Sequence, residues 1–147
     1  MTDVKDALPE LMARLFTRIR GELADTPMDG LRFSHVRVLA AVPSGGASVT
    51  VLADRVGMTK QGCGQFVGQL ADTGHVRTVP DGGDRRVRLV ELTPSGERVL
   101  AEVQRAVARV EGRLAAEAGG SRYATFRAVL EELGSSVDPR AGEGGGS

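Results

Sequence analysis

The stretch that decides the fold is residues 48–100, SVTVLADRVGMTKQGCGQFVGQLADTGHVRTVPDGGDRRVRLVELTPSGERVL. Its first part predicts two short helices. Ser48 is a good N-cap, and the apolar residues at positions 49, 52, 53 and 56 recur at the spacing of one buried helix face. Gly57 can adopt the left-handed conformation that ends a helix, and Thr59 can cap the next one. Two helices joined by a short turn that contains glycine form a helix-turn-helix.

The second of these helices, predicted for residues 60–73, has two different faces. One face buries Cys63, Phe66 or Val67, and Leu70, whereas the other is polar and free of acids until Asp72. The polar face consists of Lys60, Gln61, Gly64, Gln65, Gly68 and Gln69. Together with Gly62, its glycines each cost about 1 kcal/mol of helix propensity relative to alanine. Close approach of the helix backbone to another surface would explain them, and a loosely designed helix would explain them equally simply.

A β-hairpin is predicted directly after the helix-turn-helix. The β-branched runs HVRTVP at 75–80 and VRLVEL at 87–92 flank DGGDRR, which has the composition of a turn. The alternation is imperfect in both runs, so the position after a helix-turn-helix is what identifies the hairpin as a wing. Thr93 followed by Pro94 then predicts the sharp start of a long helix.

Further helices are expected on both sides. The apolar residues between 8 and 23 step by three and four, and a second helix is expected over residues 34–42. In the long helix after Pro94 an apolar seam follows heptad-like steps, which suits either a dimer interface or packing within the chain. Ser121 is expected to cap a last helix after the Gly119–Gly120 break. The seam is Leu100, Val103, Val107, Val110 and Leu114, and the stripe of the last helix is Tyr123, Phe126, Leu130 and Leu133.

The composition excludes several classes of protein. The 147 residues carry no net charge, which argues against coating nucleic acid through bulk charge but not against local recognition. No apolar run approaches the ~20 residues that span a bilayer, and the N-terminus lacks the features of a signal peptide. The single cysteine rules out an intramolecular disulfide. We therefore expect a soluble, cytoplasmic protein that is not membrane-bound.

The order of these signals resembles the MarR family of winged-helix regulators. The resemblance is carried by Asp84-Arg85-Arg86 in the wing and by Leu92-Thr93-Pro94-Ser95-Gly96 after it, and it covers roughly residues 5–135. It implies a mostly α fold with a small β-hairpin wing, built as a winged helix-turn-helix lobe and a helical dimerisation lobe. The expected parts are residues 1–30 and 94–135 for dimerisation, 31–93 for DNA binding, and a disordered tail at 136–147.

The physical chemistry of the helix-turn-helix suggests how such a protein would contact DNA. A helix fits the major groove, where Gln61 and Gln65 could bond adenine and Lys60 could take guanine or a phosphate. An arginine at a hairpin tip can enter the narrow minor groove, and we expect this of Arg86. Read alone, DGGDRR would be interpreted as a solvated turn, and its position behind a helix-turn-helix is what favours a DNA contact. The expected DNA-binding residues are Thr59, Lys60, Gln61, Gly64, Gln65, Asp84, Arg85 and Arg86.

The resemblance also suggests a role for Asp84 and a ligand. By analogy with the acidic wing residue of the family, Asp84 would orient an arginine, with Arg85 on that pair or on a phosphate. Many MarR-like proteins release DNA when a small aromatic or phenolic compound binds between the two lobes. The imaginable ligand-binding residues are Met12, Phe16, His35 and Arg37, although ordinary core and surface positions are an alternative for each.

Redox, metal and catalytic functions have little support in the sequence. Cys63 shares a stripe with Val67 and Leu70, so we expect a buried structural thiol rather than an oxidant sensor. His35, His75 and one cysteine make a poor metal set, and no nucleophile or nucleotide-binding motif is present. We expect no enzyme activity, no cofactor and no metal.

The function implied by the resemblance is sequence-specific regulation of transcription. We expect a homodimer that binds a double-stranded, pseudo-palindromic operator, more often as a repressor, because one recognition helix alone rarely gives enough specificity. The alternative is a winged-helix module that binds proteins and not DNA, which the neutral net charge and the glycine-rich helix would suit.

Overall fold

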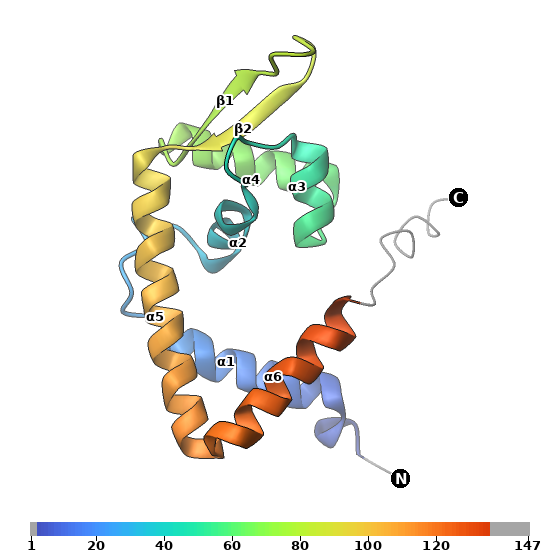
Figure 1. Ribbon diagram of the computed structural model, residues 1–147, viewed down its shortest axis with the longest axis vertical. Coiled ribbons are helices and arrows are strands. Elements are labelled where there is room, and N and C mark those ends of the chain that lie inside the picture. Colours follow the sequence, from blue (N-terminus) through green and yellow to red (C-terminus); the bar gives the residue numbers. More distant parts are fainter. Residues whose placement is uncertain (1–2, 136–147) are drawn as a thin grey trace, which may run out of the picture. The chain divides into compact units, whose positions relative to one another are not determined.

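The computed structural model describes residues 3–135, which form one short 3-10 helix, six α-helices and one hairpin. Figure 1 shows their arrangement. The predicted tail at 136–147 lies outside the described residues. The fold class predicted from the sequence is confirmed. The elements are η1 (Val4–Asp6), α1 (Leu8–Glu22), α2 (Phe33–Ala41), α3 (Val49–Val56), α4 (Lys60–Asp72), β1 (Val76–Pro80), β2 (Arg88–Leu92), α5 (Pro94–Ala118) and α6 (Gly120–Ser135).

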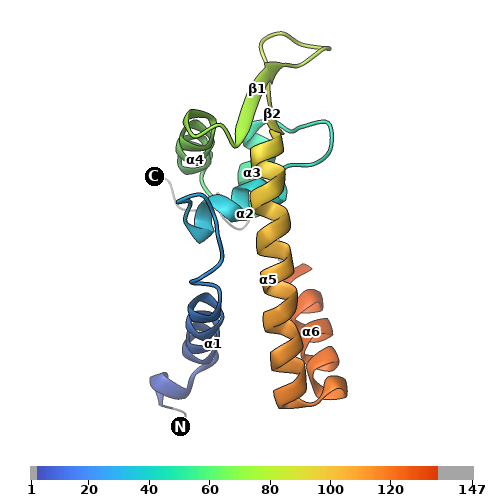
Figure 2. The same ribbon diagram turned by 90° about the vertical axis from the view of Figure 1, so that its left-hand side faces the viewer.

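The chain divides into two compact units. The winged-helix unit comprises residues 25–105, and the helical unit comprises the described residues 3–24 and 106–135. Helix α5 therefore contributes its first turns to one unit and its remaining turns to the other. Figures 1 and 2 show the winged-helix unit as α2, α3 and α4 gathered at the base of the β1–β2 hairpin.

The core of the winged-helix unit lies between its three helices and the hairpin. Its most deeply buried side chains are less than 2% exposed and come from α2, α3, α4 and β2. Burying one such aliphatic side chain stabilises the fold by about 1.5–3 kcal/mol. These residues are Val38, Leu39, Leu52, Cys63, Leu70 and Val90.

The helix-turn-helix forms for the reasons expected from the sequence. The Ser48 hydroxyl accepts a hydrogen bond from the backbone N–H of Val51, and Gly57 ends α3 with a left-handed φ of 71°. The Thr59 hydroxyl then accepts from the N–H of Gly62 at 3.0 Å and caps α4. Both caps satisfy backbone donors that the first turn of a helix leaves free.

The wing is a two-stranded antiparallel sheet in which Thr78 lies opposite Val90 and Pro80 opposite Arg88. Val90 also exchanges two backbone hydrogen bonds with Ala47, of 3.1 and 2.8 Å. This pairing with the loop before α3 was not foreseen from the sequence. It ties the base of the wing to the start of the helix-turn-helix.

The start of α5 is held against the end of α4. The Thr93 hydroxyl donates to the carbonyl oxygen of Gly74 at 2.6 Å and accepts from the N–H of Gly96, so it caps α5 as predicted. Gly96 lies directly on the backbone of His75, where a Cβ would have no room. The Leu-Thr-Pro-Ser-Gly segment therefore fixes where α5 leaves the hairpin.

In the helical unit, the last turns of α5 contact both α1 and α6. Arg18 forms two hydrogen bonds with Glu117, and Arg113 pairs with Glu22. The Tyr123 hydroxyl on α6 donates to Glu111 at 2.6 Å, which lowers the pKa of that carboxyl.

Two details of α5 and α6 differ from the sequence predictions. Along α5, Leu100 and Val107 of the predicted seam are only half-buried, and the buried positions are Val99, Val103, Ala106, Val110 and Leu114. Helix α6 begins at Gly120, so Ser121 lies inside the helix and does not cap it. The backbone N–H of Tyr123 bonds to the carbonyl oxygen of Gly119, which already supplies the first turn.

Candidate nucleic-acid interface

Helix α4 presents a polar, cation-bearing surface to solvent. Lys60, Gln61 and Gln65 are exposed, Gly64 is half-buried, and the capping residue Thr59 is exposed beside them. Within residues 3–135, neither glutamine forms a hydrogen bond through its side-chain amide. Asp72 is the single acid of α4 and lies in its last turn, so no carboxylate of this helix would repel a phosphate or occupy the polar side chains of the earlier turns. The face can therefore offer paired donors and acceptors to another molecule.

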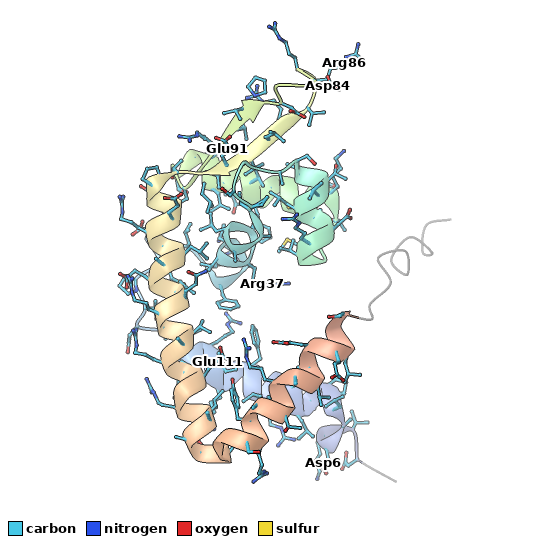
Figure 3. All side chains as sticks on the ribbon, viewed as in Figure 1. Asp6, Arg37, Asp84, Arg86, Glu91 and Glu111 are labelled. Carbon is cyan, nitrogen blue, oxygen red and sulfur yellow. The ribbon has the colours of Figure 1, made fainter. Side chains whose placement is uncertain are left out.

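The wing tip is ordered by its own aspartates. Asp81 accepts from the N–H of Gly83, and Asp84 accepts from the backbone N–H of Arg86 at 3.0 Å. The resemblance suggested that Asp84 orients an arginine side chain, whereas here its carboxylate bonds to the backbone and shapes the turn. Figure 3 shows Asp84 and Arg86 at the outer end of the hairpin, beyond the paired strands.

The tip arginines differ from the other arginines of the wing. Arg77 pairs with Glu91 across the strands at 3.0 Å, and Arg88 donates to the hydroxyl of Thr78. Within the part of the chain that the structure describes, Arg85 and Arg86 have no ion pair, and both are exposed. Two unneutralised guanidinium groups therefore stand at the tip, where they suit bidentate contacts to phosphate or to a groove.

Two arginines hold the helices of the helix-turn-helix in place by capping each other's helix. Arg37 of α2 donates to the carbonyl oxygen of Val56 at the end of α3, at 2.9 Å. Arg55 of α3 donates to the carbonyl oxygen of Ala41 at the end of α2, at 3.2 Å. A cation at a helix C-terminus bonds free carbonyls and is favoured by the helix dipole. Sequence reasoning missed this exchange, since nothing in the sequence pairs the two positions.

The four residues imagined as ligand contacts fall in different units. Met12 and Phe16 lie on α1 in the helical unit and are about half exposed. His35 and Arg37 lie on α2 in the winged-helix unit, where both are engaged. His35 is buried and bonds to Arg32 and Gln69, and the Arg37 guanidinium, labelled in Figure 3, caps α3. Their role as ligand contacts stays a prediction.

Cys63 lies in the core of the winged-helix unit with no exposed surface. Burial raises the pKa of its thiol, which disfavours the reactive thiolate. Among residues 3–135, no three acids, histidines or cysteines gather where they could hold a metal ion. None of the helices in this part of the chain is long and apolar enough to cross a membrane.

Known proteins resemble this chain both in sequence and in fold. The sequence model of the MarR family matches residues 29–87, which span the helix-turn-helix and most of the wing. The chain therefore resembles the MarR family within its winged-helix unit. Among curated proteins that it resembles, the transcriptional activatory protein BadR of Rhodopseudomonas palustris is 34% identical over 106 residues. The HTH-type transcriptional regulator PetP of Rhodobacter capsulatus is 37% identical over 97 residues.

The extent of these similarities differs between sequence and fold. The alignments cover 64% of this chain in both cases, and 61% and 55% of the two relatives, less than two thirds of their length. Solved structures match over nearly the whole chain. PcaV of Streptomyces coelicolor, in complex with its natural ligand, has a TM-score of 0.76 at 21% identity, with 94% and 99% of the two chains covered. CouR of Rhodococcus jostii, bound to p-coumaroyl-CoA, has a TM-score of 0.74 at 22% identity over the same shares.

Proposed function

We propose that this MarR-type chain is a sequence-specific DNA-binding regulator of transcription that acts as a homodimer on a pseudo-palindromic operator. The observation that carries the proposal is the pairing, within one compact unit, of an acid-free helix face and a basic hairpin tip. Lys60, Gln61 and Gln65 would contact base edges in the major groove, while Arg85 and Arg86 would contact the backbone or the minor groove. Both curated relatives are named as proteins of transcription, which supports the same function.

The helical unit supports the homodimer. Ten large hydrophobic side chains are exposed among the described residues, and eight of them lie on α1 and α6. Exposed apolar surface of this kind marks a protein interaction site, and self-association through a two-fold axis is its commonest use. A cavity of about 480 Å³ between α1, α5 and α6 would receive side chains of the second copy. The exposed residues on these helices are Leu8, Leu11, Met12, Phe16, Phe126, Val129, Leu130 and Leu133.

Regulation by a small aromatic or phenolic compound is the finer part of the proposal. It is supported by the solved structures of PcaV and CouR, which share the fold and are described with bound ligands. The family resemblance suggests that the protein represses transcription, although BadR is named as an activatory protein. The proposal includes no catalytic role, since both curated relatives are named as proteins of transcription.

Selection of DNA by the purified full-length protein tests this function. A random duplex library is passed over the protein through repeated rounds, and the recovered sequences are aligned and footprinted. We expect an inverted repeat whose half-sites are about one helical turn apart, because a two-fold dimer presents two copies of α4. Recovery of no enriched sequence, or binding that is equal on selected and random DNA, would contradict the proposal and favour a protein-interaction module.

A further inference from the structure

The protonation of His35 is fixed by its two hydrogen bonds. His35 on α2 is only 7% exposed, and its Nδ1 accepts the backbone N–H of Arg32 at 3.1 Å. A neutral imidazole carries one proton, so that proton must be on Nε2. Nε2 lies 2.7 Å from Oε1 of Gln69 on α4 and therefore donates to it. Phe66 packs edge-on against the ring, with centroids 5.0 Å apart and planes at 89°, and holds its orientation.

This bond determines which end of Gln69 remains available. An amide offers an acceptor oxygen on one side and a two-proton donor nitrogen on the other. Because the oxygen is directed to the buried His35, the NH₂ group is directed away from it. The side chain of Gln69 is exposed, so the donor end is open to another molecule. Gln69 is thus a donor with its acceptor already engaged.

Gln69 continues the polar face of α4. It stands four residues after Gln65 and eight after Gln61, a spacing that keeps all three on one side of the helix. Within residues 3–135 the side-chain amides of Gln61 and Gln65 form no hydrogen bond, so both ends of these amides are free. A free glutamine can pair with adenine through one donor and one acceptor, whereas an amide whose oxygen is directed to a buried partner presents only its donor end to a groove.

We propose that Gln69, oriented by His35, is a further DNA contact that presents only its donor end and so favours an acceptor group. That group is either guanine, the base that presents two acceptors (N7 and O6) and no donor in the major groove, or a phosphate oxygen. The inference rests on the proposed DNA-binding function. His35 is a positioning residue: it touches no DNA, and it acts by keeping the Gln69 oxygen away from the groove. The sequence offered His35 as a ligand contact and left Gln69 as one polar position among several.

The experiment uses the full-length protein and the duplex that wild type selects from a random library. Gln69→Met keeps the length of the side chain but removes the donor, and His35→Phe keeps the ring against Phe66 but removes the N–H. The double variant completes a cycle. Gln104→Met, at an exposed position on α5, is the matched control. Circular dichroism and thermal unfolding establish that each variant is folded.

We expect Gln69→Met to bind the duplex about tenfold more weakly, the effect of roughly one hydrogen bond, while Gln104→Met binds as wild type does. His35→Phe should bind a few-fold more weakly, and the double variant no more weakly than Gln69→Met. In His35→Phe the side-chain amide of Gln69 is free to turn. Replacing the contacted guanine by adenine should therefore weaken binding by this variant less than it weakens binding by wild type.

Modified DNA separates the two sources of the acceptor. Guanines are replaced singly by 7-deazaguanine, which lacks N7, or by 2-aminopurine, which lacks O6, and phosphates are replaced singly by neutral methylphosphonates. At one position per half-site, one of these changes should weaken wild type about tenfold and leave Gln69→Met unaffected. A guanine position identifies base readout, and a phosphate position identifies backbone contact.

Three outcomes would overturn the inference. Wild-type affinity in Gln69→Met would show that Gln69 makes no contact with DNA. This result does not depend on whether His35→Phe folds, because Gln69→Met changes an exposed side chain only. Equal sensitivity of wild type and Gln69→Met to every modification would show the same. Additive losses in the double variant would remove His35 as a positioning residue. Failure of wild type to select any duplex would instead contradict the proposed function itself.

Discussion

The backbone carbonyl oxygen of His75 lies so close to Gly96 that a Cβ on this glycine would be 2.1 Å from the oxygen. The same glycine donates its N–H to the hydroxyl of Thr93, which in turn donates to the carbonyl of Gly74. The glycine of the Leu-Thr-Pro-Ser-Gly segment is thus required by close packing of α5 on the end of α4.

Substitution of Gly96 should lower the stability of the winged-helix unit. Gly96→Ala forces a methyl group into a backbone carbonyl, and we expect it to lower the free energy of unfolding by about 3 kcal/mol. Gly112→Ala is the control, because it lies within α5 with no atom within 4 Å of the added Cβ. It should raise that free energy by up to ~1 kcal/mol. Urea titrations of both variants measure the difference, and equal stability of the two would refute the packing argument.

A substitution at Gly68 should have opposite effects on the stability of α4 and on DNA binding by this helix. A Cβ at Gly68 would meet nothing within 4 Å, so Gly68→Ala should raise the free energy of unfolding by up to ~1 kcal/mol. If the backbone of α4 approaches DNA closely, the same methyl group should weaken binding of the selected duplex. Gly112→Ala should gain stability with unchanged affinity. A Gly68→Ala protein that binds DNA as wild type does would favour the loosely designed helix instead.

The buried thiol should make stability depend on pH in the alkaline range. Burial raises the pKa of Cys63, so the folded state keeps the proton to a higher pH than the unfolded state does. Its contribution is complete below the unfolded pKa of about 8.5 and is lost as pH rises from there through the folded pKa. The stability advantage of wild type over Cys63→Ala should therefore shrink above about pH 8.5, as measured by urea titrations between pH 7 and 10.

The same thiol should be inert in the folded protein. Because Cys63 has no exposed surface, a thiol reagent should modify native protein far more slowly than urea-unfolded protein. Peroxide should affect DNA binding of wild type and Cys63→Ala equally. Native protein that reacts at the unfolded rate would contradict the structural role of this cysteine.

The exposed face of α6 should hold the homodimer together. Leu130 on α6 is 39% exposed and Val51 on α3 is 41% exposed, which makes them a matched pair in different units. Leu130→Glu would bury a charge in the proposed interface and should shift the protein from dimer to monomer in sedimentation velocity. Val51→Glu should leave the dimer intact. A wild-type monomer at micromolar concentration, or a Leu130→Glu dimer, would refute this use of α6.

Local signals made much of the fold predictable. Ser48, Thr59 and Thr93 cap the helices that the sequence assigned to them, because an N-cap needs only a hydroxyl and the next few N–H groups. The hairpin followed in the same way from two β-branched runs around a turn. Such features depend on residues a few positions apart, which a sequence displays directly.

Features that join distant parts of the chain were missed. The pairing of Ala47 with Val90 and the bond between His35 and Gln69 span 43 and 34 residues, and no local pattern signals them. The bond from the backbone N–H of Arg86 to Asp84 was not foreseen either, because the family resemblance pointed to an arginine side chain as the partner of this aspartate, a role that stays a prediction. The sequence thus identified candidate contact residues, and tertiary structure supplies what orients them.

The central claim is that the wing tip and α4 bind DNA, and a salt titration of two wing variants tests it most directly. Fluorescence anisotropy gives the affinity of wild type, Arg86→Ala and Arg77→Ala for the selected duplex across a range of salt concentrations. In the described part of the chain the guanidinium of Arg86 has no ion pair, while that of Arg77 is already neutralised by Glu91. Arg86→Ala should weaken binding strongly and, if it meets a phosphate, reduce the slope of log affinity against log salt by about 1. Arg77→Ala should change neither, and unchanged affinity in Arg86→Ala would contradict the assignment of the wing to DNA.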